Sequence, residues 1–163
     1  MIMTDTKFEH GTIEPSLDKP TLLIVDDTPQ NIDVLVASLS DEYTIKVALN
    51  GLKALAIAAT NPRPDIILLD VMMPDMDGYE VCKRLKESPM TAKIPVIFVT
   101  AKHDIKDEER GFAMGAVDYI IKPISPPIVR ARVRTHIALY DQNRQLQKKV
   151  AERTQALEAS QLR

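Results

Sequence analysis

The sequence of 163 residues contains no tryptophan, a single cysteine, and aromatic residues at only 4% of positions. Because Cys82 has no second cysteine to pair with, an internal disulfide is excluded, and we interpret Cys82 as a helix residue in a reducing compartment. No apolar run approaches the ~18 residues of a membrane span, and the N-terminus lacks the basic-then-apolar pattern of a signal peptide. We therefore expect a soluble, cytoplasmic protein with an aliphatic core.

Several common functional motifs are absent as well. The sequence has no GxxxxGK(S/T), no GxGxxG and no Ser-His-Asp arrangement, and its three histidines are too scattered to form a metal pattern. Nothing resembles a helix-turn-helix, which disfavours direct DNA binding. The net charge of −2 divides into −7 over residues 1–127 and +5 over residues 128–163. This is a mild asymmetry between an acidic body and a basic tail, and it does not indicate nucleic-acid binding.

The sequence does contain five short apolar runs separated by helix-like segments. Ile66–Leu69 and Val96–Val99 are almost uninterrupted, which is typical of strands buried on both faces. Alternation of strands and helices favours a parallel sheet covered on both sides. We predict an α/β fold with a doubly wound five-stranded sheet in the order 2-1-3-4-5. The runs are Thr21–Val25, Thr44–Val47, Asp65–Leu69, Pro95–Val99 and Val117–Ile121.

Four helices are expected between these runs. The first has Thr28 as its N-cap, and the second covers Gly51 to about Thr60, with Leu52, Leu55 and Ala59 on one side. The third follows Asp77-Gly78, and the fourth covers about Lys106–Met114 and ends near Gly115, a plausible C-cap. We divide the chain into a loose N-terminal tail (1–19), a main domain (20–140) and a helical extension (141–163).

The extension continues a fifth domain helix that starts near Ser125, and the whole segment is long for a globular helix. Its apolar positions recur in steps of four and three, which is the spacing of a coiled coil. Two core positions of that repeat are polar, and three heptads are few. The repeat consists of Leu139, Asn143, Leu146, Val150, Arg153, Leu157 and Ser160.

Polar residues follow four of the five runs. If the strands are parallel, all of these groups emerge at one edge of the sheet, where open α/β sheets bind ligands. The clustered carboxylates of Asp26, Asp27 and Asp70 would raise one another's pKa values unless a cation joined them, and Mg²⁺ suits such oxygen ligands. Asp70 is then the natural nucleophile, because an aspartyl carboxylate can accept a phosphoryl group. Lys122 and Thr100 could contact that group.

These residues resemble the receiver domain of two-component response regulators. The resemblance covers about residues 20–140 and implies a flavodoxin-like fold. Each motif is weak alone, since the acids could be ordinary loop or turn residues and Lys122 a surface residue, but the ordered set is specific. The motifs are Val25-Asp26-Asp27, Leu69–Pro74, Asp77-Gly78, Val99-Thr100-Ala101 and Lys122-Pro123.

The resemblance implies a role for each matching residue. Asp70 would be the phosphoacceptor, with Thr100 as the switch hydroxyl, Lys122 as the phosphate contact and Tyr119 as the aromatic switch that turns inward. The peptide bond between Lys122 and Pro123 would be cis. For Mg²⁺, Asp27 and Asp70 would be ligands, Asp26 would act through water, and the backbone carbonyl of Met72 would complete the site.

The resemblance further implies that the phosphoryl group comes from a sensor histidine kinase or a phosphotransfer protein. Phosphorylation would remodel the face of the fourth helix, fifth strand and fifth helix, and would alter homodimer packing through the extension. The extension resembles linkers that precede cyclic di-GMP phosphodiesterase, diguanylate cyclase or histidine-kinase modules, so the chain could be a fragment of a longer regulator. We expect no catalysis on external substrates, and slow self-dephosphorylation because Met72 cannot orient a water molecule.

Two other functions stay open on the residues alone. One is a Mg²⁺-dependent phosphatase with Asp70 as its nucleophile, although Met72 stands where such enzymes commonly need a second acid. The other is an inert interaction module with a coiled-coil tail, which leaves the complete set of acids, hydroxyl and lysine unexplained.

Overall fold

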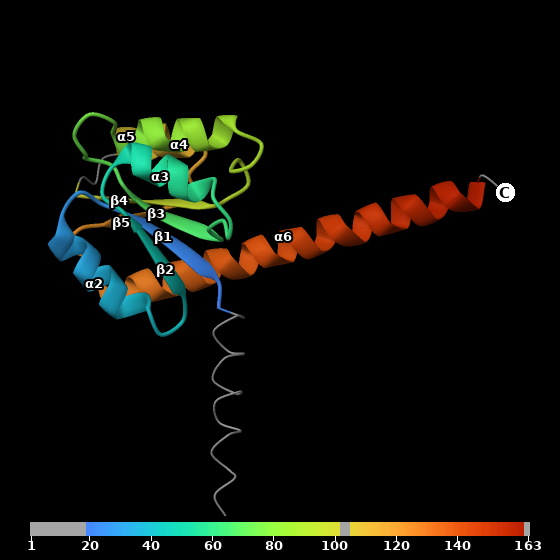
Figure 1. The fold of residues 1–163 in the computed structure, drawn as a ribbon, viewed down its shortest axis with the longest axis horizontal. Helices are drawn as coiled ribbons and strands as arrows, with labels where there is room; N and C mark the ends of the chain where they lie inside the picture. The colour runs from blue at the N-terminus through green and yellow to red at the C-terminus, as the bar shows by residue number, and fades with distance from the viewer. Residues whose placement is uncertain (1–18, 102–104, 162–163) are drawn as a thin grey trace, which may run out of the picture.

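The computed structural model describes residues 19–101 and 105–161, which form a five-stranded parallel sheet flanked by helices (Figure 1). The strand order is β2-β1-β3-β4-β5, as predicted. The expected N-terminal tail lies almost wholly outside the described residues. The strands are β1 (Thr21–Val25), β2 (Thr44–Ala48), β3 (Ile66–Asp70), β4 (Val96–Thr100) and β5 (Asp118–Ile121).

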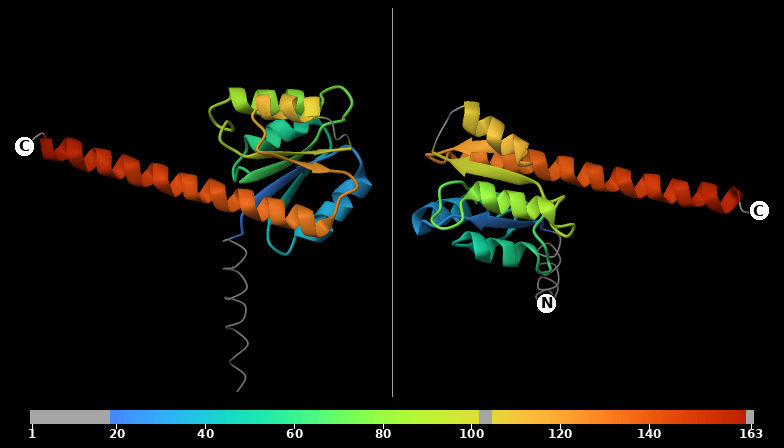
Figure 2. Two further views of the ribbon diagram at one scale, coloured as in Figure 1. Left: turned by 180° about the vertical axis from the view of Figure 1, so that it is seen from behind. Right: turned by 90° about the horizontal axis from the view of Figure 1, so that it is seen from above.

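Helices cover both faces of the sheet. On one side lie α2 (Pro29–Leu39) and the first half of α6 (Pro126–Gln161) (Figures 1 and 2). On the other side lie α3 (Gly51–Ala58), α4 (Gly78–Glu87) and α5 (Ile105–Ala113). Each layer has its own hydrophobic core, and β1, β3 and β4 contribute alternate side chains to both, which is why their sequences are apolar almost throughout.

The strand ends bring the polar residues together. Asp70 and Thr100 are the last residues of β3 and β4, and Asp26 follows β1 directly. Because every pair of neighbouring strands is parallel, these ends lie at the same edge of the sheet. Lys122 joins them through a main-chain hydrogen bond from its N–H to the Thr100 carbonyl, at 2.8 Å.

Two local expectations differ from the structure. In α3 the buried residues are Gly51, Ala54 and Ala58, whereas Leu52 is 68% exposed and Ala59 is also exposed. The reason is close packing, since a Cβ at Gly51 would lie 2.9 Å from side-chain atoms of Met76 and Val81.

Thr28 does occupy the N-cap position of α2, but its side chain makes no capping hydrogen bond. Its hydroxyl instead donates to Asp27 Oδ1 at 3.5 Å, while its main-chain N–H donates to Asp26 Oδ1. The start of α2 is therefore organised around the acids rather than around a Thr cap.

The fifth predicted helix is a continuous helix of 36 residues, α6, and its second half projects from the body (Figure 1). Val129 and Val133 are fully buried, whereas Ile128 is 49% exposed. Beyond Ile137 the apolar positions of the heptad repeat are half or more exposed. None of the helices within the described ranges is long and apolar enough to cross a membrane.

Candidate functional site

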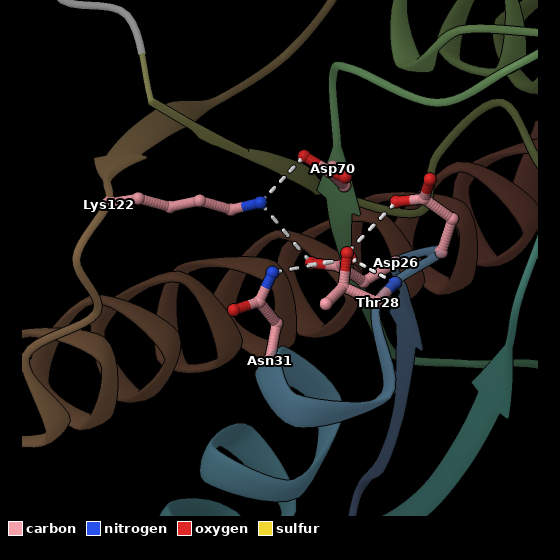
Figure 3. Close-up of polar contacts among 6 residues, drawn as sticks. Asp26, Thr28, Asn31, Asp70 and Lys122 are labelled. Atoms are coloured by element: carbon pink, nitrogen blue, oxygen red, sulfur yellow. Dashed lines mark hydrogen bonds and ion pairs between the residues drawn. The ribbon is translucent and has the colours of Figure 1, made fainter.

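An ammonium group and two buried carboxylates form the centre of the site (Figure 3). Lys122 Nζ lies 3.1 Å from Asp70 Oδ1 and 3.5 Å from Asp26 Oδ2. Asp26 and Asp70 are almost inaccessible to solvent, at 1% and 2% exposure. Burying a charged carboxylate costs free energy unless a positive group lies beside it. The contact with Lys122 is therefore needed for Asp26 and Asp70 to be ionised at the same time.

The two carboxylate oxygens of Asp26 differ in their hydrogen bonding. Its Oδ1 accepts hydrogen bonds from the Thr28 main-chain N–H at 2.8 Å and from Asn31 Nδ2 at 3.5 Å. Its Oδ2 is buried and accepts no hydrogen bond from the residues that the structure describes. A buried acceptor without a donor indicates that a further positive group belongs beside it.

A divalent metal ion fits this arrangement. One carboxylate oxygen from each of Asp26, Asp27 and Asp70 can be chosen such that all three lie within 4.8 Å of one another. Asp27 is exposed, so this side of the cluster remains open to solvent. Three carboxylates around an accessible point, one with an oxygen that accepts no hydrogen bond, are the donor set that Mg²⁺ prefers.

The electrostatics of these side chains lead to the same conclusion. Burial, and next the charge of Asp26, raise the pKa of Asp70 from 3.8 to about 6, while Lys122 opposes this rise. One lysine therefore does not compensate for the burial and mutual repulsion of the acids. A second cation would favour the ionised carboxylate, which is the form that can act as a nucleophile.

The other predicted residues surround this centre to different degrees. Thr100 is buried at the end of the neighbouring strand, and Lys122 and Pro123 are joined by a cis peptide bond, as the resemblance implied. Met72 lies in the loop after Asp70 with its side chain 60% exposed, so only its main chain is a candidate for the metal site.

Tyr119 lies away from the carboxylates, on β5 beneath α5. Its ring is buried against Phe98 and Phe112, with centroids 5.5 Å away in each case, and its hydroxyl donates to the Asp107 carbonyl. The ring thus already occupies the inward position that we expected it to reach on phosphorylation.

Sequence reasoning missed Asn31 and Tyr79, and it gave Gly78 no role beyond its place in the Asp77-Gly78 motif. Asn31 reaches back from α2 to Asp26, and Gly78 allows the start of α4 to lie against the main chain of Asp70. Tyr79, buried beside Tyr119, had no assigned role. The dipeptide Asp77-Gly78 was a usable signal, since Asp77 caps α4 by accepting from the Glu80 N–H at 2.9 Å.

A doubly wound parallel sheet with an acidic cluster and a lysine at its switch point defines a flavodoxin-like α/β protein built to hold a charged group. Residues 22–134 match the family model described as the response regulator receiver domain, and the chain belongs to this family. The match includes every carboxylate and the lysine of the site.

Curated relatives extend the comparison. The chain is 44% identical over 159 residues to a protein of Vibrio cholerae named "Probable cyclic di-GMP phosphodiesterase", covering 93% of this chain and 36% of that protein. It is 47% identical over 115 residues to the response regulator PleD of Caulobacter vibrioides, covering 70% of this chain and 25% of PleD. The chain thus spans about a third or less of the length of these relatives.

Solved structures agree in fold. The receiver domain of a signal transduction histidine kinase from Syntrophus aciditrophicus is 35% identical, with a TM-score of 0.67 over 73% of this chain and 90% of that chain. The BeF₃-activated receiver domain of DrrB, a Thermotoga maritima protein, is 33% identical, with a TM-score of 0.63 over 72% of this chain and 96% of that chain.

Proposed function

We propose that this chain is a phosphorylation-dependent switch in which Asp70 accepts a phosphoryl group from a phosphohistidine of a sensor kinase or phosphotransfer protein. An oxygen of Asp70 forms a bond to phosphorus while the phosphorus–nitrogen bond to the partner's histidine breaks. The observation that best supports this proposal is the position of Lys122, whose ammonium group lies 3.1 Å from Asp70 Oδ1. A phosphoryl group on Asp70 would meet this cation directly.

Mg²⁺ is the proposed cofactor, with Asp27, Asp70 and the main-chain carbonyl of Met72 as the ligands that would hold it and Asp26 acting through water. When bound, it supplies positive charge that offsets the acids and the phosphoryl oxygens. Lys122 orients the Asp70 carboxylate through its hydrogen bond to Oδ1, and Thr100, at the end of the adjacent strand, donates a hydrogen bond from its hydroxyl to the attached group. Tyr119, inward beneath α5, links this event to the face formed by α5, β5 and α6.

A reaction with acetyl phosphate and Mg²⁺ tests the phosphoacceptor role. We expect the intact mass to rise by one phosphoryl group per chain, with no rise in Asp70→Asn. The matched control is Asp41→Asn, since Asp41 is exposed and follows α2 at the opposite edge of the sheet. Continued turnover of acetyl phosphate without limit would instead indicate a phosphatase, and no modification of the wild type would indicate an inert module.

The proposed output is an effector domain that acts on cyclic di-GMP in a longer protein. The alignment with the Vibrio cholerae relative covers 93% of the 163 residues, which leaves about eleven unaligned, fewer than the 23 residues of the extension. That relative therefore shares at least half of the distal part of α6. The alignment with PleD, in contrast, covers only 70% of the chain.

We also propose that α6 forms a parallel homodimer through its exposed heptad stripe. Leu146, Val150 and Leu157 are between 60% and 64% exposed, so the described part of the body does not cover them. Asn143 at a core position favours two strands in register. Light scattering with and without beryllofluoride, on the full chain and on a chain truncated after Leu139, tests this: four equal masses would contradict it.

A further inference from the structure

Tyr79 connects the phosphoacceptor loop to the helix α5. It is the second residue of α4 and is buried, at 6% exposure. The preceding Gly78 donates its N–H to the Val71 carbonyl at 2.9 Å, and a Cβ at Gly78 would overlap the main chain of Asp70. The backbone that carries Tyr79 therefore rests directly on the main chain of the phosphoacceptor residue.

The helix α5 holds the Tyr79 side chain by two contacts. The Tyr79 hydroxyl donates to the Asp107 carbonyl at 3.4 Å, and the Arg110 guanidinium carbon lies 4.2 Å from the centre of the Tyr79 ring. Asp107 and Arg110 are three residues apart and so lie on the same face of α5. Tyr79 consequently bridges two neighbouring helices, α4 and α5, on one side of the sheet (Figure 2).

The same carbonyl also holds Tyr119. The Tyr119 hydroxyl donates to Asp107 as well, and the Phe98 ring contacts both tyrosines, with centroid distances of 5.2 Å to Tyr79 and 5.5 Å to Tyr119. Burial, followed by its contact with the Tyr79 hydroxyl, raises the pKa of Tyr119 well above the usual 10.0. The hydroxyl groups of both tyrosines thus lie together at the Asp107 carbonyl, inside an aromatic cluster.

Gly111 makes room for this cluster. A Cβ at this position in α5 would overlap the Tyr119 hydroxyl and would lie 2.9 Å from Phe98 Cδ2. Any other residue here would force the Tyr119 ring or the helix to move. The inward position of Tyr119 therefore depends on a glycine on α5 as well as on the hydroxyl from α4.

We propose that Tyr79 is a positioning residue of the switch, which couples the main chain of Asp70 to α5 by holding Tyr119 inward in the space left by Gly111. This inference rests on the proposed function and adds a second route to the one through Thr100. A movement of the Asp70 loop shifts Tyr79 and with it α5. By the reciprocity of coupled equilibria, weakening this contact lowers the affinity for a phosphoryl mimic.

Two variants test the proposal while leaving the aromatic packing in place. Tyr79→Phe removes only the hydroxyl, and Arg110→Gln removes only the cation over the ring. The control is Tyr43→Phe, since Tyr43 is a buried tyrosine in the opposite layer. The chain has four tyrosines, so ring-labelled tyrosine gives few NMR signals, and Tyr119→Phe identifies that of Tyr119.

We expect both variants to shift the Tyr119 ring signal towards that of an exposed tyrosine, and to weaken beryllofluoride binding in the presence of Mg²⁺ about threefold to tenfold. Gly111→Ala should shift the signal furthest. An unchanged Tyr119 signal and unchanged affinity in Tyr79→Phe would overturn the proposal. If the wild type does not bind beryllofluoride, the proposed function fails, while the Tyr119 signal in ligand-free variants still decides this inference.

Discussion

The body of the domain and the distal half of α6 use similar residues in opposite ways. Leu68 in β3 is completely buried, whereas Leu146 in α6 is 60% exposed. In the body, neighbours from the same chain define the position of each side chain, down to the carboxylates of the site. In the distal part of α6, the described chain supplies no such neighbours to the apolar stripe. The acidic cluster and Lys122 thus belong to the pre-organised body, and the exposed stripe belongs to the extension.

The largest expected difference between the two regions is in stability. Leu68→Ala should lower the free energy of unfolding by about 3–5 kcal/mol, because it removes buried methyl groups and leaves a cavity. Leu146→Ala should change it by less than about 0.5 kcal/mol when measured at concentrations where the chain is monomeric. Urea unfolding followed by circular dichroism measures both, and equal losses would contradict the comparison.

The next largest effect is the loss of folding stability caused by the buried carboxylate of Asp70. The pKa of Asp70 is raised to about 6, so the folded chain binds this proton more tightly than the unfolded chain does. Its contribution to stability is complete below about pH 4 and is lost as the pH rises through 6. In chelator at pH 7, Asp70→Asn should therefore raise the free energy of unfolding by on the order of 2 kcal/mol.

The same variant should flatten the dependence of stability on pH between about 4 and 6. Glu158→Gln serves as the control, since Glu158 lies on the exposed extension. The contrary result would be a wild-type stability that rises with pH across this interval, with the same rise in Asp70→Asn. It would show that ionised Asp70 does not destabilise the folded state.

Mg²⁺ should stabilise the body by a smaller amount. A ligand that binds only the folded state adds about 1.4 kcal/mol when present at ten times its dissociation constant. We expect this gain, seen as a rise in Tm with MgCl₂, to persist in a chain truncated after Leu139 and to be largely lost in Asp27→Asn. A gain that depends on the extension instead would place the metal outside the acidic cluster.

The smallest effect is expected where the two regions meet. Arg144 Nη1 lies 3.8 Å from Asp65 Oδ1, and Lys93 Nζ lies 3.4 Å from Gln147 Oε1. These contacts are exposed, so Arg144→Ala should change the free energy of unfolding by less than about 0.5 kcal/mol. A larger loss would mean that the packed body extends further along α6 than burial indicates.

The parts of the fold that were predictable from sequence are those set by local patterns. Apolar runs such as Ile66–Leu69 identified the strands, and their polar ends identified Asp70 and Lys122 as neighbours. The predicted buried face of α3 was wrong, because Met76 and Val81 lie so close to Gly51 that no larger side chain fits there, and Leu52 is exposed instead. Such selection depends on distances between helices, which a single sequence does not reveal.

The aromatic cluster was unpredictable for a related reason. Tyr79 and Tyr119 are 40 positions apart in the sequence, and both of their hydroxyls donate to the Asp107 carbonyl of a third segment. A main-chain acceptor has no signature in side-chain identity. The role of Gly111 could not be predicted either. Position 111 requires glycine because the Tyr119 ring of another element lies against it, and not because of its own backbone conformation.

The most direct test is to locate the phosphoryl group after the reaction with acetyl phosphate, by mass spectrometry of peptides from the modified chain. Stoichiometric label on the peptide that contains Asp70, dependent on Mg²⁺, is the result expected from its place beside Lys122 and the two neighbouring acids. Label on any other residue, or none under conditions where the chain is folded, would contradict the assignment of Asp70 as phosphoacceptor.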